Sequence, residues 1–151
     1  MKNISLEGKF VELIPDEKEN IDVKNLHTGL AIKDMKSGKI LGKIYSYQYN
    51  QIDDYISFSV EIEKDVNSDV VFEACNIFFN YLFTCFPIRK IYYEGNCYCI
   101  EVMKELKKIG FKVEANLKKD YFCFGEYCDR YILALYRNNF CEGNWLWMRI
   151  I

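Results

Sequence analysis

The sequence predicts one α/β domain with a mixed, mostly antiparallel central sheet. Its 151 residues suffice for one hydrophobic core and are too few for two. Half of them are hydrophobic and 17% are aromatic, which excludes a disordered chain because the apolar surface offsets the entropy of ordering. Segments with the two-residue period of strands surround two segments with helical periodicity, and this order predicts the α/β class.

The first half of the chain predicts strands. The clearest is Tyr55–Glu63, where apolar residues alternate with Ser and Glu. Two earlier apolar runs flank a Gly-containing turn at Lys36–Lys39, which is typical of a hairpin. Glu17–Leu26 has a weak apolar stripe, enough for one or two helical turns. The other strands expected here are Phe10–Ile14, Leu30–Asp34 and Ile40–Tyr49.

The second half begins with an amphipathic helix, for which Ser68 is the expected N-cap and Pro87 the end. A second helix, Ile100–Ile109, closes at Gly110, and Asn96 suits the N-cap position before it. The strands expected in this half are Ile88–Tyr93, Lys112–Leu117 and Tyr131–Tyr136, the last two separated by Lys118–Arg130.

Charge and cysteine content narrow the class of function. The chain has 20 basic and 22 acidic residues, so it lacks the excess of basic residues that nucleic-acid binding needs. The beginning of the chain is polar, and no apolar run is long enough for a membrane span. The seven cysteines are odd in number, which favours reduced thiols in the cytoplasm. With His27 as the only histidine, we expect no metal site and interpret the cysteines as small buried hydrophobes.

The order of the expected strands and helices, together with several short sequence motifs, resembles the GCN5-related N-acetyltransferase (GNAT) family. The resemblance is closest to the subgroup that acetylates protein N-termini, including those of ribosomal proteins. The resemblance covers Leu6 to Tyr136. It is carried by "LEGKFVELIP", "GKILGKIY", "VEIEKDVNSDVVFEACNIFFNYLF" and "IRKIYYEG", and most specifically by Gly110-Phe111 and the later Gly125-x-Tyr127-x-Asp129. It implies a GNAT-like domain over residues 1–137, flanked by a hydrophobic extension over residues 138–151.

The resemblance also implies a chemistry. An amine of a small molecule or peptide attacks acetyl-CoA, or another acyl-CoA, bound where the fourth and fifth strands diverge, and no metal takes part. A helix N-terminus binds the pyrophosphate through its amides and dipole. Glu61 and Glu63 are the candidate general bases; the other interpretation is exposed strand carboxylates with ordinary pKa values. The residues expected at the acyl-CoA site are Lys64, Asn67, Ser68, Asp69, Val70 and Cys99.

This sequence departs from the family pattern at the phosphate loop and in the second helix. Asp69 stands where the family has Gly or Ala, and its charge opposes a diphosphate. Asn67 could replace the loop glycine in a left-handed conformation; the alternative is a capped helix that binds no phosphate. Cys99 replaces a frequent Asn and has no evident base, so we interpret it as a buried thiol. Leu106 and Val102 stand where the usual proton donor would be.

Three further features leave the function open. Only 15 residues, Pro15–Gly29, occupy an interval where the family usually has two helices that wall the acceptor pocket. The extension Asn138–Ile151 carries two Trp and several aliphatic residues, and would either pack on the domain or form a homodimer or partner surface. Tyr127 and Asp129 would either approach the acceptor or close a hairpin. An acyltransferase and a diverged, non-catalytic binding module are therefore both hypotheses.

Overall fold

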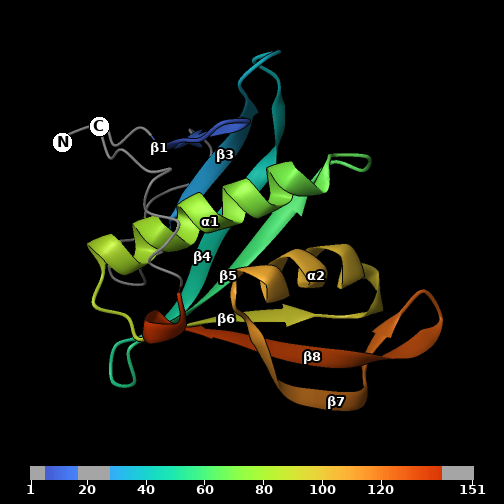
Figure 1. Cartoon of the computed structure of the whole chain (residues 1–151). Coiled ribbons are helices and arrows are strands. Elements are labelled where there is room, and N and C mark those ends of the chain that lie inside the picture. Colours follow the sequence, from blue (N-terminus) through green and yellow to red (C-terminus); the bar gives the residue numbers. More distant parts are fainter. Residues whose placement is uncertain (1–5, 17–27, 141–151) are drawn as a thin grey trace.

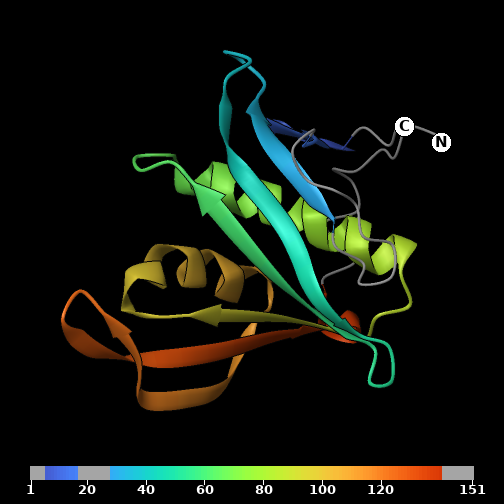
Figure 2. The same ribbon diagram turned by 180° about the vertical axis from the view of Figure 1, so that it is seen from behind.

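The computed structural model describes residues 6–16 and 28–140, which form an eight-stranded sheet with two α-helices, α1 (Ser68–Cys85) and α2 (Ile100–Ile109), on one face (Figure 1). The other face of the sheet is free of helices in this part of the chain (Figure 2). The strands are β1 (Leu6–Glu7), β2 (Val11–Pro15), β3 (Gly29–Asp34), β4 (Ile40–Asn50), β5 (Tyr55–Ile62), β6 (Lys90–Gly95), β7 (Lys112–Cys123) and β8 (Glu126–Tyr136).

The sheet is mixed and mostly antiparallel, as predicted. Its strand order is β1-β2-β3-β4-β5-β6-β8-β7. Only the β5–β6 pair is parallel among the described strands, because α1 connects them and returns the chain to the same end of the sheet. All other neighbours pair antiparallel. This arrangement agrees with the fold class that the sequence predicts.

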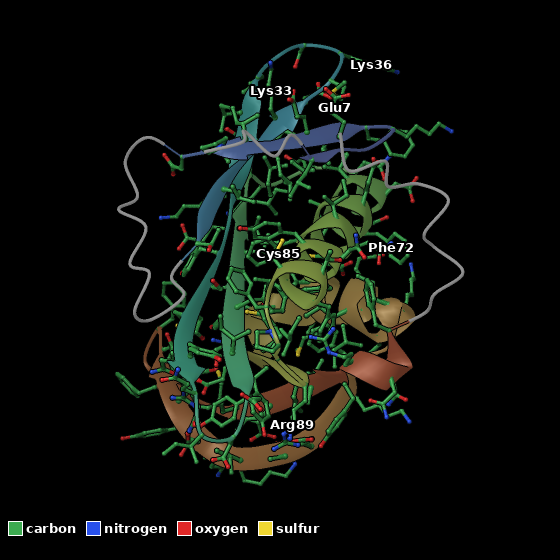
Figure 3. All side chains as sticks on the ribbon, turned by 90° about the vertical axis from the view of Figure 1, so that its left-hand side faces the viewer. Glu7, Lys33, Lys36, Phe72, Cys85 and Arg89 are labelled. Carbon is green, nitrogen blue, oxygen red and sulfur yellow. The ribbon has the colours of Figure 1, made fainter. Side chains whose placement is uncertain are left out.

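The core lies between the helices and the sheet and is rich in aromatic rings. Phe58 on β5 is fully buried, and its ring centroid lies 4.6 Å from that of Phe79 on α1 and 5.8 Å from that of Phe111. Phe79 and Phe111 also contact each other at 5.1 Å. Viewed along α1 from its Cys85 end, β4 and β5 lie on one side of the helix and Phe72 on the other (Figure 3). These ring contacts pack α1 and the residue that follows the C-cap of α2 against the same face of β5.

The start of α1 differs by one residue from the prediction. Asn67 is the N-cap, because its side-chain oxygen accepts a hydrogen bond from the Asp69 amide at 2.9 Å. Ser68 is already the first helical residue. Asn67 is also not left-handed, with φ −57° and ψ 138°, whereas Asp65 in the preceding loop has φ 67°. The expected N-cap role of Ser68 and the expected left-handed conformation of Asn67 are therefore wrong, since Asn67 caps the helix itself.

Arg137 holds the other end of α1. Its guanidinium donates to the carbonyl oxygens of Phe83 at 2.6 Å, Phe86 at 2.7 Å and Ile88 at 2.8 Å. A cation at these unpaired carbonyls complements the negative end of the helix dipole. The following Phe140 is buried against Phe83, with ring centroids 5.5 Å apart. The chain after β8 is thereby fastened to the end of the helix.

The segment Lys118–Arg130 is not a separator, because most of it continues the two strands. β7 and β8 form one long hairpin that closes at Phe124 (φ 50°) and Gly125 (φ 81°). Positive φ at both central residues is the backbone of a tight hairpin turn. Two register shifts interrupt β7, between Val113 and Ala115 and between Leu117 and Tyr121. These shifts break the strict alternation by which the sequence would have shown the strand.

Two predictions fall on residues outside the described ranges: the weak helix at Glu17–Leu26 and most of the hydrophobic extension, from Cys141 onward. The division between residues 1–137 and 138–151 likewise stays a prediction.

One short strand, β1, was not expected. It pairs with β2, and the Glu73 carboxylate on α1 accepts the Phe10 amide of the connecting turn at 2.9 Å.

Candidate active site

The strands β5 and β6 separate along their length. They pair from Tyr55 opposite Lys90 to Ser57 opposite Tyr92, and beyond that position they no longer pair with each other (Figure 2). Each remains bonded to its outer neighbour, β5 to β4 and β6 to β8. The two facing strand edges therefore offer backbone donors and acceptors to a ligand that would complete the ladder.

Tyr93 follows the last residue of β6 that pairs with β5 and belongs to the core on the helix side of the sheet. The Tyr93 ring is buried and lies 5.2 Å from that of Phe58. Burial and the adjacent Cys99 thiol raise the pKa of Tyr93, so its hydroxyl stays protonated. A Cβ at Gly95 would come within 3.0 Å of the Tyr93 ring and 3.1 Å of the Met103 sulfur. A larger residue at position 95 would therefore require the Tyr93 ring and the Met103 side chain to shift.

Cys99 lies at the same place and is half-buried rather than buried. Its thiol donates a weak hydrogen bond to the Asn96 side-chain oxygen at 3.7 Å. That oxygen also accepts the Tyr98 amide at 2.9 Å, which makes Asn96 the cap of the 3₁₀ turn Cys97–Cys99 leading into α2. Asn96 therefore caps the 3₁₀ turn and not the α-helix for which the cap was expected, since the N-cap of α2 is Cys99.

The amides at the start of α1 are partly occupied by the protein. The Asn67 side chain accepts from Asp69 N, and the Asn67 carbonyl accepts from Val70 N at 3.0 Å. Those are two of the four amides that a helix N-terminus leaves unpaired. Asp69 and Lys64 are both exposed, so one cation and one anion flank the place that the resemblance assigns to a pyrophosphate.

A pocket of about 390 Å³ opens where β5 and β6 last pair. Tyr55 and Tyr92 meet edge to face in its wall, with ring centroids 5.2 Å apart. A bulge in β7 between Val113 and Ala115 leaves Glu114 without a partner residue on β8 and directs it into the same pocket. The residues that matter for its chemistry are Tyr55, Ser57, Tyr92, Glu94 and Glu114.

Both carboxylates of the pocket have cationic partners. Lys90 lies 2.8 Å from Glu114, and Tyr136 donates to the same carboxylate at 2.9 Å. Burial acts against both charges, but these hydrogen bonds outweigh it, raising the pKa of Lys90 and lowering that of Glu114. Arg130 donates to Glu94 at 3.0 Å. The pocket is therefore polar but nearly balanced in charge.

The carboxylate of Glu94 on β6 affects the pKa of Tyr47 on β4. The Tyr47 side chain is half-buried, and burial followed by the field of Glu94 raises the pKa of its hydroxyl. Tyr47 pairs with Ser57 in the β4–β5 register. A phenol from β4 and a carboxylate from β6 thus approach the position where β5 and β6 begin to diverge.

The two predicted general bases lie farther along β5. Glu61 is exposed, 3.6 Å from the Lys43 ammonium, and accepts from the Tyr45 hydroxyl at 3.4 Å. Glu63 is exposed and pairs with Lys39 at 3.1 Å. Neither borders the pocket. Sequence reasoning missed Glu94, although the alternation within Lys90–Gly95 places it on the face of Tyr92; Glu114 depends on a bulge that leaves no signal.

Other predicted landmarks have structural partners. Asp129 lies within β8, where the Lys119 amide donates to its carboxylate at 3.0 Å and Lys118 pairs with it at 3.2 Å. The hydrogen bond from the Lys119 backbone amide, followed by the ion pair with Lys118, lowers the pKa of Asp129. The Tyr127 ring packs at a tilt against that of Phe122, with centroids 5.0 Å apart. Leu106 is fully buried in the core, so no proton donor stands there.

The cysteine prediction was wrong for most thiols. Cys75 is fully buried, and burial raises its pKa. Cys85 and Cys97 are exposed, while Cys123 and Cys128, like Cys99, are half-buried. In the described part of the chain, no group of three or more potential ligands could hold a metal ion. None of the described helices has the length and apolar character to span a membrane.

No family model matches the sequence, and no curated protein matches it either. Solved structures do. Spermidine N-acetyltransferase from Vibrio cholerae, in complex with CoA and spermine, is 18% identical, with 78% of this chain and 70% of that chain covered and a TM-score of 0.71. The N-terminal domain of ribosomal-protein-alanine acetyltransferase from Clostridium acetobutylicum is 19% identical, with 90% and 98% covered and a TM-score of 0.67. The chain therefore has the fold of the GCN5-related N-acetyltransferases.

Proposed function

We propose that the protein transfers an acetyl group from acetyl-CoA to an amine. The observation that carries this proposal is the divergence of β5 from β6 beyond the Ser57–Tyr92 pair, with a pocket at the same position. A neighbour of the same fold is described in complex with CoA and an amine, spermine. A cytoplasmic protein acting on a small molecule or peptide is consistent with this proposal.

The open edges of β5 and β6 fit an extended ligand arm, because they present unpaired backbone groups. Cys99 and the protonated Tyr93 hydroxyl would lie on the helix side of that arm. Lys64 and the first amides of α1, including those of Ser68, Asp69 and Val70, would hold the diphosphate. Bound acetyl-CoA would supply the thioester from which the acetyl group passes to the amine while CoA leaves as a thiol.

The N-terminus of α1 fits a diphosphate less well than the open edges of β5 and β6 fit the extended arm of the ligand. The Asn67 oxygen must release the Asp69 amide before that amide can bind a phosphate oxygen. The exposed Asp69 carboxylate adds repulsion. We therefore expect acetyl-CoA to bind weakly, and we expect acyl donors with less negative charge to bind more tightly.

The acceptor amine is assigned to the pocket beside Ser57 and Tyr92. Glu94 lines that pocket, and its carboxylate lies 3.0 Å from the Arg130 guanidinium. Glu61 stands four residues beyond Ser57, about 13 Å along the strand at ~3.3 Å per residue. We propose Glu94 as the base, with Glu61 and Glu63 as the two alternatives.

Three variants separate these carboxylates. Purified protein is given acetyl-CoA and a panel of primary amines, and CoA release and acetylated product are measured. Glu94→Gln should lower kcat at least about 100-fold, which is typical of losing a general base, while Glu61→Gln and Glu63→Gln stay within a few-fold of the parent. Loss of activity only in Glu61→Gln or Glu63→Gln would move the base to that residue.

A second candidate function is a non-catalytic binding module with this fold. It is favoured by the self-capped start of α1, where Asn67 and Asp69 occupy the expected phosphate position. In that case the parent protein releases no CoA with any amine and shows no thermal shift with millimolar acetyl-CoA. Measurable turnover by the unaltered protein would exclude this second candidate.

A further inference from the structure

Cys97 and Cys128 come from separate elements and place their sulfur atoms in contact. Cys97 begins the 3₁₀ turn after β6, and Cys128 lies in β8. Their Sγ atoms are 3.2 Å apart. A disulfide has an S–S distance of about 2.05 Å, so a shift of roughly 1 Å at two side chains would join them.

The surrounding structure holds these thiols in place. β6 is paired with β8 as far as Gly95 opposite Tyr131, two residues before Cys97. On the hairpin side, Cys128 is paired with Tyr121 of β7. The Tyr98 ring, next to Cys97, meets the Phe124 ring at the hairpin tip with centroids 5.3 Å apart. Turn and hairpin therefore meet at two adjacent contacts, and the sulfur pair does not depend on one flexible side chain.

The thiols differ in accessibility. Cys97 is exposed and Cys128 is half-buried. The hydrogen bond with Cys97, followed by burial, raises the pKa of Cys128 to about 11. A soluble oxidant thus meets the Cys97 sulfur first, and Cys128 is placed behind it as the resolving thiol.

We propose that Cys97 and Cys128 form a reversible disulfide with low-molecular-weight disulfides as the oxidant. The Cys97 thiolate attacks one sulfur of the small disulfide RSSR, an S–S bond breaks, and RS⁻ leaves. Cys128 loses its proton to water and attacks Cys97 Sγ, forming the protein disulfide and releasing the second RS⁻. Two protein thiols are oxidised and RSSR is reduced to two RSH.

The product would tie the entrance of α2 to β8. Cys99 and Asn96, which border the β5–β6 opening, belong to the same turn as Cys97. A cross-link here fixes the wall of that opening. The disulfide itself does not depend on the proposed acetyl transfer, and a protein without enzymatic activity would form it equally well.

The test uses the full chain, reduced and then incubated with glutathione disulfide. The mass of the intact protein should fall by about 2 Da for the two hydrogens lost, and peptide mapping should link Cys97 to Cys128. The melting temperature should rise by roughly 5 °C or more, since the bond closes a long loop of the unfolded chain. Dithiothreitol should reverse both changes.

Single variants provide the matched comparison. Cys128→Ser should stop at a mixed disulfide with one glutathione on Cys97, whereas Cys85→Ser, an exposed thiol on α1, should still form the internal bond. A stable glutathione adduct on Cys97 of the parent protein, or a link from Cys97 to Cys123 or any other cysteine, would overturn the proposal. The parent mapping needs no variant, so a folding defect in one cannot hide the answer.

Discussion

Replacing Asp69 by Asn should strengthen the binding of CoA. Asp69 is exposed in the first turn of α1, and its backbone amide already donates to Asn67. The substitution removes a negative charge and leaves that backbone bond unchanged. It isolates the electrostatic part of the mismatch between α1 and a diphosphate.

The size of the effect follows from Coulomb's law. One helical turn, about 5 Å, is a fair separation between the Asp69 carboxylate and an anion on the neighbouring amides. Two unit charges at that distance repel by about 3 kcal/mol at an effective dielectric of 20. Salt at physiological strength, with a Debye length of about 8 Å, roughly halves this value. The remaining ~1.5 kcal/mol corresponds to roughly tenfold tighter binding.

Isothermal titration with CoA at two salt concentrations measures the change. The matched control is Asp53→Asn, which removes the same charge from the β4–β5 turn and should leave the affinity unchanged. The gain for Asp69→Asn should shrink at high salt, since screening weakens the repulsion. The free protein should lose about 0.5 kcal/mol of stability, because an acid favours the helix N-terminus. Equal affinities for parent and Asp69→Asn would refute a diphosphate at this helix.

Other predictions concern stability. Lys90→Met should lower the free energy of unfolding, measured in urea, by about 2 kcal/mol, which is less than for a fully buried pair because Glu114 is 31% exposed. The control Lys104→Met, at an exposed lysine, should leave the free energy of unfolding almost unchanged. Equal losses in the two variants would contradict a stabilising ion pair between Lys90 and Glu114. The lowered pKa of Glu114 means that its contribution is complete above about pH 4.3 and is lost as the pH falls through its folded value, so parent and Lys90→Met should converge in acid. Gly8→Ala, whose Cβ would collide with the Glu73 carboxylate that holds the Phe10 amide, should cost about 1–3 kcal/mol, whereas Glu73→Gln should cost less.

The local patterns of the sequence were enough to predict most of the sheet and both helices. Tyr55–Glu63 alternates because one face packs on α1, and that burial is what a period of two records. The cap of α1 was displaced by one residue because Asn67 and Ser68 both suit an N-cap, and only the side-chain bond of Asn67 to Asp69 decides between them.

The hairpin and the candidate site depend on contacts that the sequence does not record locally. β7 is exposed along most of its length and shifts register twice, so its strand character beyond Leu117 comes from pairing with β8. Glu114 reaches the pocket through one of those shifts. Cys97 and Cys128 are 31 residues apart in sequence, and only the arrangement of the turn after β6 beside β8 brings them together.

Calorimetric titration of the unaltered protein with CoA and acetyl-CoA is the most direct test of whether the opening between β5 and β6 is an acyl-CoA site. The proposal predicts saturable binding of one ligand per chain, weak enough to need micromolar to millimolar concentrations. It also predicts that a short pantetheine, which lacks the diphosphate, retains most of the affinity. No heat with either ligand at millimolar concentration, together with no thermal shift, would contradict it.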